Sequence, residues 1–141
     1  MISELENNIE REIKSLTKNI HLANPPVKSE KVVELKKLDP SLTVYTKLIT
    51  IFRTEYTNRI PEMKKHCETR DLENLSRIIH RFKSTTYNLG AARASEFTKE
   101  IESAITRKSG EFYIKQLIGQ LERECISAHE HLLTFIPASH S

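Results

Sequence analysis

One histidine, His80, combines a nucleophilic ring with a nearby cation. On a helical wheel of about 100° per residue it falls well away from the apolar stripe of its segment, so its imidazole is expected to face solvent. Lys83 and Ser84 follow at i+3 and i+4, which makes both its neighbours on a helix surface. The lysine can offset the charge of an anionic group on the imidazole, and the small serine leaves room for another protein's active site. The pattern therefore indicates a histidine that can carry an anionic modification.

The remaining histidines and the two cysteines form no comparable group. His129 and His131 are two residues apart and would point about 200° apart on a helix, so they could not chelate one metal ion together. The others lie on charged faces or near helix or chain ends: His21, His66 and His140. Cys67 and Cys125 sit in apolar stripes without CxxC spacing, which favours buried free thiols over a disulfide or metal role. No metal site is expected.

The chain that positions His80 has the composition of an all-α protein. It contains only 3 glycines and 5 prolines among 141 residues, so it has few helix breakers. Apolar residues recur at helical spacing over residues 2–21, 39–67, 72–89, 92–108 and 111–136. Because the turns between the last four segments are short, these helices must pack antiparallel. The sequence therefore predicts an all-α, antiparallel four-helix bundle (up-down-up-down) with an additional N-terminal amphipathic helix.

Capping residues and helix breakers predict where these helices begin and end. Helix starts are expected at N-cap residues: Asp39, followed by Pro40, and Asp71. Pro61 predicts a kink or a break near Arg59-Ile60. Gly90 is expected to end the His80 helix in the left-handed conformation, and Gly110 to close the helix after it.

These elements divide the chain into four parts. We expect an N-terminal amphipathic helix at 1–22, a linker with a short helical piece at 23–38, the bundle at 39–136 and a tail at 137–141. The stripe of the first helix is too apolar to be left in water. Docking onto the same bundle is therefore preferred, with a dimer contact or a partner contact as the alternatives.

The run from His80 to Ala91, HRFKSTTYNLGA, resembles the signature of the histidine-phosphotransfer (Hpt) domain family, approximately H-x-L-K-G-S-S-x-x-L-G-A. Five residues match it outright: His80, Lys83, Leu89, Gly90 and Ala91. Four positions differ: Phe82 replaces an aliphatic residue, Thr85 and Thr86 replace small hydroxyl residues, and Ser84 is the fourth. Ser84 stands where the family usually has glycine, which predicts weaker or altered docking. The flanking Asp71-Leu72 and Ile101-Glu102 also fit, so the resemblance covers about residues 39–136.

The resemblance implies a phosphoryl carrier rather than an enzyme. His80 would accept a phosphoryl group on its outer ring nitrogen from a receiver-domain phosphoaspartate, or from a kinase, and pass it to a response-regulator receiver. Lys83 would stabilise the phosphoryl group, and Gly90 would serve as a structural helix end. No intrinsic cofactor is implied, since Mg²⁺ is expected on the partner receiver.

The same helical wheel places four residues around His80 for partner docking: Arg77, Ile79, Ser84 and Tyr87. The expected partners are receiver domains or a hybrid histidine kinase. One alternative is a helical bundle that only binds a signalling partner; retention of both His80 and Lys83 argues against it. The second alternative is a fragment of a histidine kinase. The absence of a Gly-rich ATP lid from the chain argues against it.

Charge and hydropathy exclude other classes of function. The net charge is only +3, and acidic residues are interleaved with basic ones, so nucleic acid is not an expected partner. No apolar stretch approaches the roughly 20 residues of a membrane span, and the N-terminal residues lack the apolar segment of a signal peptide. A cytoplasmic monomer is expected.

Overall fold

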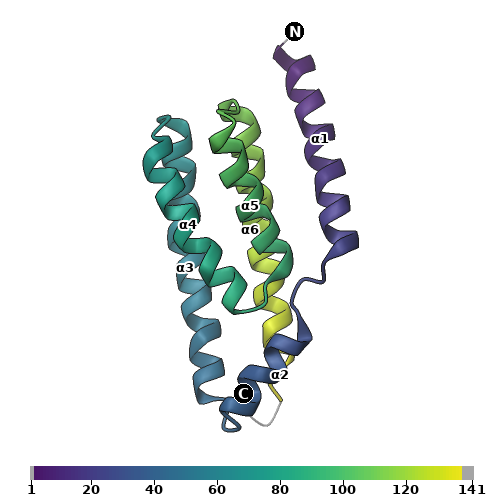
Figure 1. Ribbon diagram of the computed structural model, residues 1–141, viewed down its shortest axis with the longest axis vertical. Coiled ribbons are helices and arrows are strands. Elements are labelled where there is room, and N and C mark those ends of the chain that lie inside the picture. Colours follow the sequence, from purple (N-terminus) through teal and green to yellow (C-terminus); the bar gives the residue numbers. More distant parts are fainter. Residues whose placement is uncertain (1, 138–141) are drawn as a thin grey trace.

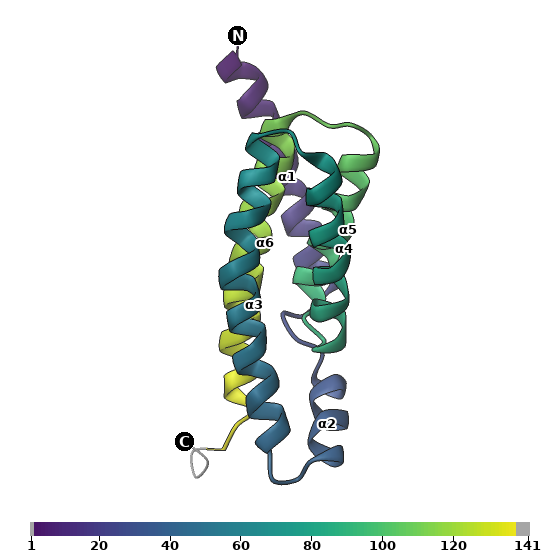
Figure 2. The ribbon, with the colours of Figure 1, turned by 90° about the vertical axis from the view of Figure 1, so that its left-hand side faces the viewer.

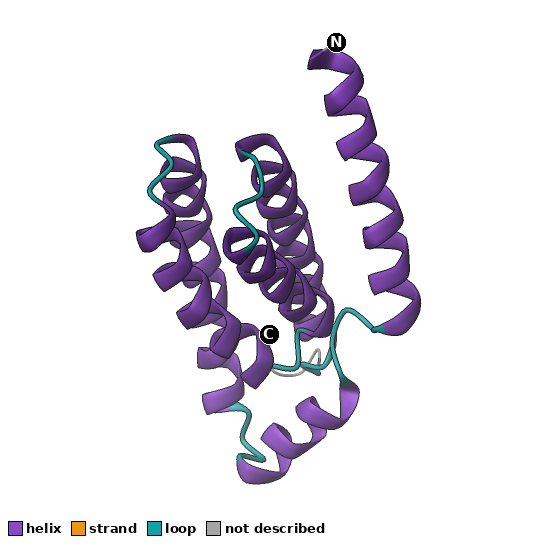
Figure 3. Cartoon of the chain, turned by 45° about the horizontal axis from the view of Figure 1, so that its top comes forward, coloured by secondary structure: helices purple, strands orange, loops and turns teal. Residues whose placement is uncertain are grey.

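The computed structural model describes residues 2–137, and these residues form helices and connecting loops without any strand (Figures 1 and 3). The helices are α1 (Ile2–Ala23), α2 (Ser29–Leu38), α3 (Thr43–Glu68), α4 (Leu72–Asn88), α5 (Ala92–Thr106) and α6 (Glu111–Thr134). The predicted all-α class is confirmed. The last three helices end within about two residues of their predicted ends, which is the usual uncertainty of a helix boundary.

Helices α3 to α6 enclose one apolar core. Each packs against two others, because α3 contacts α4 and α6 while α5 contacts the same two helices. Connections of three or four residues join consecutive members of this group. Phe52 of α3 lies at the centre, with its ring 5.2 Å from that of Tyr56 and 6.5 Å from that of Phe82 on α4. Burial of such large side chains is the main favourable contribution to folding.

The turn after α4 is determined by local sequence. Gly90 has φ +74°, and its N–H donates to the Tyr87 carbonyl, while the Ala91 N–H donates to the Thr86 carbonyl. These two bonds form a Schellman motif, which needs a left-handed residue at this position. The expected left-handed end at Gly90 is therefore confirmed. A Cβ atom at Gly90 would lie 2.8 Å from Cβ of Lys31 on α2, so glycine is also required for close packing.

The predicted closure of the helix after α4 by Gly110 needs correction. The helix after α4 is not closed by Gly110, because α5 ends at Thr106 and Lys108 takes the left-handed conformation with φ 57°. The extended Gly110 instead precedes α6. The Ser109 N–H and the Lys108 N–H bond back to carbonyls of the last turn of α5. This hydrogen bonding offsets the steric cost of a non-glycine residue in that conformation.

Helix α3 differs from its prediction at two places. It begins at Thr43 rather than after Asp39, yet the Asp39 carboxylate still accepts the Val44 N–H at 2.6 Å and so satisfies a free donor of the first turn. The helix also continues through Pro61, so the expected break is absent. Ile60 and Met63 on either side of the proline are buried, and this packing holds the helix together across the missing hydrogen bond.

The first two helices pack onto the outside of this bundle. Helix α1 lies against α6 and α5, with Ile13 and Ile20 buried, which confirms docking onto the same bundle. Helix α2 covers the end where α4 meets α5 (Figures 1 and 2). Its Val32 is buried, and the Lys28 N–H donates to the Gly90 carbonyl at 2.8 Å. The short helical piece expected within residues 23–38 is thus α2, which begins at Ser29.

Candidate functional site

Helix α4 presents His80 to solvent because its apolar stripe faces the other way. Leu75, Ile79 and Phe82 are buried on the core side of the helix. The His80 side chain lies on the opposite side and is 73% exposed. Asp71 starts this helix, since its carboxylate accepts the Asn74 N–H at 3.3 Å as an N-cap. The amphipathic pattern and the cap together determine the direction in which the imidazole points.

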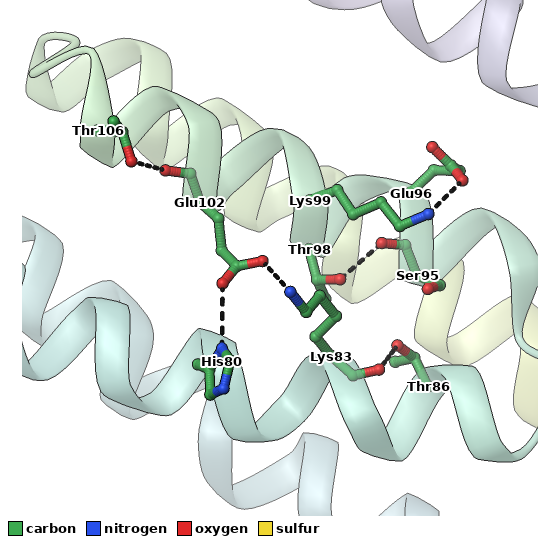
Figure 4. Close-up of polar contacts among 9 residues, drawn as sticks. All are labelled: His80, Lys83, Thr86, Ser95, Glu96, Thr98, Lys99, Glu102 and Thr106. Carbon is green, nitrogen blue, oxygen red and sulfur yellow. Dashed lines mark hydrogen bonds and ion pairs between the residues drawn. The ribbon is translucent and has the colours of Figure 1, made fainter.

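A carboxylate from α5 joins His80 to Lys83 (Figure 4). Oε2 of Glu102 lies 3.4 Å from His80 Nδ1, and Oε1 lies 2.7 Å from Lys83 Nζ. Glu102 is 26% exposed. Burial tends to raise the pKa of this carboxyl, but hydrogen bonds from Lys83 and His80 outweigh burial and hold the pKa below its ordinary value. Glu102 is therefore ionised near neutral pH.

This arrangement defines the roles of the two ring nitrogens. The ionised Glu102 can only accept hydrogen bonds, so it favours the form of His80 that carries a proton on Nδ1. In the neutral ring the other nitrogen, Nε2, then holds the free lone pair. Because the side chain is largely exposed, that nitrogen is available as a nucleophile to a second molecule. The charges of Lys83 and Glu102 balance one another beside it.

The four residues expected to surround His80 do not all reach the surface. Ser84 and Tyr87 are exposed, and the Tyr87 ring centre lies 5.6 Å from the amine of Lys31 on α2. Arg77 is exposed and pairs with Glu73 on the same helix. Ile79, in contrast, is 0% exposed and belongs to the core, so its expected place in a docking surface is wrong. It precedes His80 by one residue, and the resulting rotation of about 100° carries it inward.

Glu102 is the site residue that the sequence did not identify. It lies 22 positions after His80 on another helix, and no spacing rule within one helix connects the two. The sequence feature that could have identified Glu102 is the Ile101-Glu102 pair, which lies beside the motif that begins at His80. That signal marked a resemblance but assigned no role to the carboxylate.

The other histidines lie away from this site. His21 on α1 contacts the buried Glu124 of α6, and His66 Nδ1 lies 3.5 Å from the Asp71 carboxylate. His129 lies against the Tyr56 ring, and His140 is outside the described residues. Within residues 2–137, no group of three or more His, Cys, Asp or Glu side chains is arranged to hold a metal ion.

The two cysteines are buried free thiols, as predicted. Burial raises the pKa of both Cys67 and Cys125, which keeps them protonated and unreactive. Among the helices that the structure describes, none combines the length and the apolar character that crossing a membrane requires.

Comparison with known proteins gives one match. The family model of the Hpt domain matches residues 47–131, which include α4, α5, most of α3 and most of α6. His80, Lys83 and Glu102 all lie within the matched region, whereas α1 and α2 lie outside it. No curated protein and no solved structure matches the chain.

Proposed function

Because the chain belongs to the Hpt domain family, we propose that it carries a phosphoryl group on His80 between the signalling proteins of a phosphorelay. Hpt domains have a histidine-phosphotransfer role and are carriers rather than catalysts. In this proposal His80 accepts the group from a receiver-domain phosphoaspartate, or from a kinase, and donates it to a response-regulator receiver. The bundle formed by α3 to α6 has the up-down-up-down arrangement, and the protein acts as a monomer.

The observation that carries the proposal is the hydrogen-bonded group of His80, Glu102 and Lys83. Its geometry suits a nucleophile whose Nδ1 is held by a carboxylate while Nε2 remains accessible. Glu102 faces Nδ1 and leaves Nε2 toward solvent, and Lys83 supplies a cation one turn along the same helix. A solvated histidine without a function would need neither the oriented carboxylate nor the lysine.

The transfer step follows from this geometry. The Nε2 lone pair attacks phosphorus in line, the N–P bond forms, and the bond from phosphorus to the aspartyl oxygen breaks. The aspartate leaves as a carboxylate with that electron pair. The ring keeps its Nδ1 proton and gains positive charge, which Glu102 stabilises at the moment it develops. The reverse sequence, with a second receiver's aspartate as the nucleophile, delivers the phosphoryl group onward.

The carrier leaves most of the catalysis to its partner. The receiver provides Mg²⁺ and the residues that stabilise the transferring phosphoryl group, and no cofactor of the carrier is proposed. Lys83 pairs with the phosphoryl oxygens once the group has arrived. Arg77, Ser84 and Tyr87 lie on the exposed face around His80 and are proposed to contact the docking receiver.

The proposal is tested by transfer from a phosphorylated receiver domain. The wild-type protein is expected to acquire acid-labile, base-stable phosphate, and His80→Gln is expected to acquire none. His131→Gln is the matched control, since His131 is an exposed histidine on α6 that forms no ion pair among the described residues. Equal labelling of His80→Gln and the wild type would overturn the proposal. Absence of label in both proteins, with receiver binding retained, would favour a module that only binds.

A further inference from the structure

A hollow opens beside the site, toward the C-terminal end of α4, and its lining combines apolar surface with several polar side chains. It has a volume of about 320 Å³, and residues of α4 and α5 line it: Lys83, Ser84, Tyr87, Asn88, Ser95 and Lys99. Two of these residues are lysines, and none of the six is acidic. The hollow therefore presents ammonium, hydroxyl and amide donors, which are the groups that bind the oxygens of a phosphoryl group.

Phosphorylation of His80 would upset the charge balance next to this hollow. In the unphosphorylated site, the positive charge of Lys83 and the negative charge of Glu102 neutralise each other. A phosphoryl group brings about −1.5 to −2 charges near neutral pH, and it would arrive close to the ionised Glu102. Lys83 cannot neutralise both anions, because its amine already lies 2.7 Å from Glu102. A second cation is needed to restore the balance.

Lys99 is placed to be that cation. It precedes Glu102 by three residues on α5, so the two side chains start from neighbouring positions on the helix surface, about 5–6 Å apart. In the unphosphorylated protein its amine lies 3.2 Å from Glu96, and the side chain is 57% exposed. Figure 4 shows it extending along α5 toward Glu96, away from Glu102. An exposed pair of this kind is weak, so a phosphoryl group competes with Glu96 for the amine.

We propose that Lys99 is a second phosphoryl-stabilising residue, whose amine leaves Glu96 and crosses the hollow to the phosphoryl oxygens when His80 is phosphorylated. The inference rests on the proposed function of His80. It separates two roles: Lys83 is positioned by Glu102 before transfer, whereas Lys99 responds to the phosphorylated state.

A cation on the phosphoryl oxygens should lengthen the life of the phosphorylated protein. In hydrolysis, an oxygen of water bonds to phosphorus, the N–P bond breaks, and the imidazole leaves with that electron pair as a neutral ring that keeps its Nδ1 proton. The attacking water gives up a proton to the phosphate product or to solvent. The loose transition state resembles metaphosphate, which carries less negative charge on its oxygens than the starting group. Lys99 therefore stabilises the ground state more than the transition state, and hydrolysis slows.

The test uses the full chain phosphorylated with potassium phosphoramidate, which needs no partner protein. Modification of His80 is confirmed by mass spectrometry against His80→Gln, and folding by circular dichroism. The hydrolysis half-life is then measured for Lys99→Met, which keeps the aliphatic stem, and for Lys99→Arg, which keeps the charge. Lys115→Met on α6 is the matched control. It also removes an exposed lysine, but α6 packs mainly against α3 and α5 rather than against α4, which carries His80.

Lys99→Met is expected to shorten the half-life about two- to five-fold, the size of an exposed charge pair, whereas Lys99→Arg and Lys115→Met leave it near wild type. Glu96→Gln frees Lys99 and should lengthen the half-life. Phosphorus NMR should show a raised pKa of the phosphoryl group in Lys99→Met, because a nearby cation is lost.

Equal half-lives and equal phosphoryl pKa values in Lys99→Met, Lys115→Met and the wild type would overturn the inference. So would an effect of Lys99→Met confined to the rate of transfer from a receiver, since that result would place Lys99 in docking. Failure of the proposed function has a different signature, because His80 would then accept no phosphoryl group from a receiver even where phosphoramidate modifies it.

Discussion

Replacing Glu102 by glutamine removes the carboxylate charge beside His80 while keeping the length of the side chain. The amide oxygen can still accept a hydrogen bond from Nδ1, so the ring orientation is retained. In the proposed transfer step, what is lost is the stabilisation of positive charge on the ring during attack at phosphorus. The variant therefore isolates the electrostatic contribution of Glu102 to transfer.

The size of this effect follows from the geometry. A hydrogen bond to a charged group contributes about 1.5–3 kcal/mol when it is well formed. The distance between His80 Nδ1 and Glu102 Oε2 is 3.4 Å, longer than the usual range of about 2.7–3.2 Å, and the exposed imidazole is partly screened by water. About half of the lower and upper values, roughly 0.75–1.5 kcal/mol, is expected to remain. This corresponds to a transfer rate roughly four- to thirteen-fold slower than that of the wild type.

The assay is single-turnover transfer from a saturating phosphorylated receiver domain, followed by rapid quenching. Glu100→Gln is the control, since this glutamate lies two residues before Glu102 on α5. Its charge acts on Tyr113 of α6, where it helps to raise the pKa of the phenol. The expected order is wild type and Glu100→Gln together, with Glu102→Gln slower. Equal rates in all three proteins would refute the role of Glu102 as the residue that stabilises ring charge.

Three further predictions concern stability. Gly90→Ala should lower the free energy of unfolding by about 2 kcal/mol, because the backbone angle φ of +74° and the nearby Lys31 both oppose a Cβ atom. Gly119→Ala inside α6 should instead raise the free energy of unfolding by about 0.5–1 kcal/mol, and denaturant titration of both variants checks the contrast. Tyr45→Phe should cost about 0.5–1.5 kcal/mol in the same titration, because the buried hydroxyl donates to the Leu132 carbonyl at 2.7 Å and this hydrogen bond is lost, while the carbonyl still accepts the Phe135 N–H. A cost near zero would contradict this. The pKa of Glu102 is held below its ordinary value of 4.5 in the folded protein. The stabilisation that ionised Glu102 contributes is therefore present above pH 4.5 and is lost as the pH falls through the folded pKa. The drop in Tm between about pH 7 and about pH 3 should accordingly be smaller in Glu102→Gln than in the wild type.

Local chemistry was sufficient to predict much of this fold. The helical repeat of apolar residues identified the helices, and it also placed His80 outside the apolar stripe, because both results depend only on the period of about 3.6 residues. Asp71 and Gly90 were predicted for the same reason, since an N-cap oxygen and a left-handed glycine act within one turn of the chain.

Predictions failed where packing outweighed a local preference. Pro61 was expected to kink or break its helix, and the break is absent because buried neighbours on both sides keep α3 continuous. Lys108 adopts a left-handed conformation that glycine normally occupies, because the turn between α5 and α6 provides the compensating hydrogen bonds. The failure at Ile79 is of another kind: it was assigned to the docking surface because it is next to His80, although the helical rotation of about 100° per residue already turns it into the core.

The sequence by itself determined that a histidine with a lysine at i+3 would lie exposed on an amphipathic helix, because both relations are internal to α4. The tertiary structure alone decided which residues of α5 lie next to this histidine and this lysine. Packing of α5 against α4 brings Glu102 to His80 and Lys83, and places Lys99 on the same hollow. These contacts join separate helices, so they depend on the relative rotation and register of the two helices, which the period of either helix does not specify.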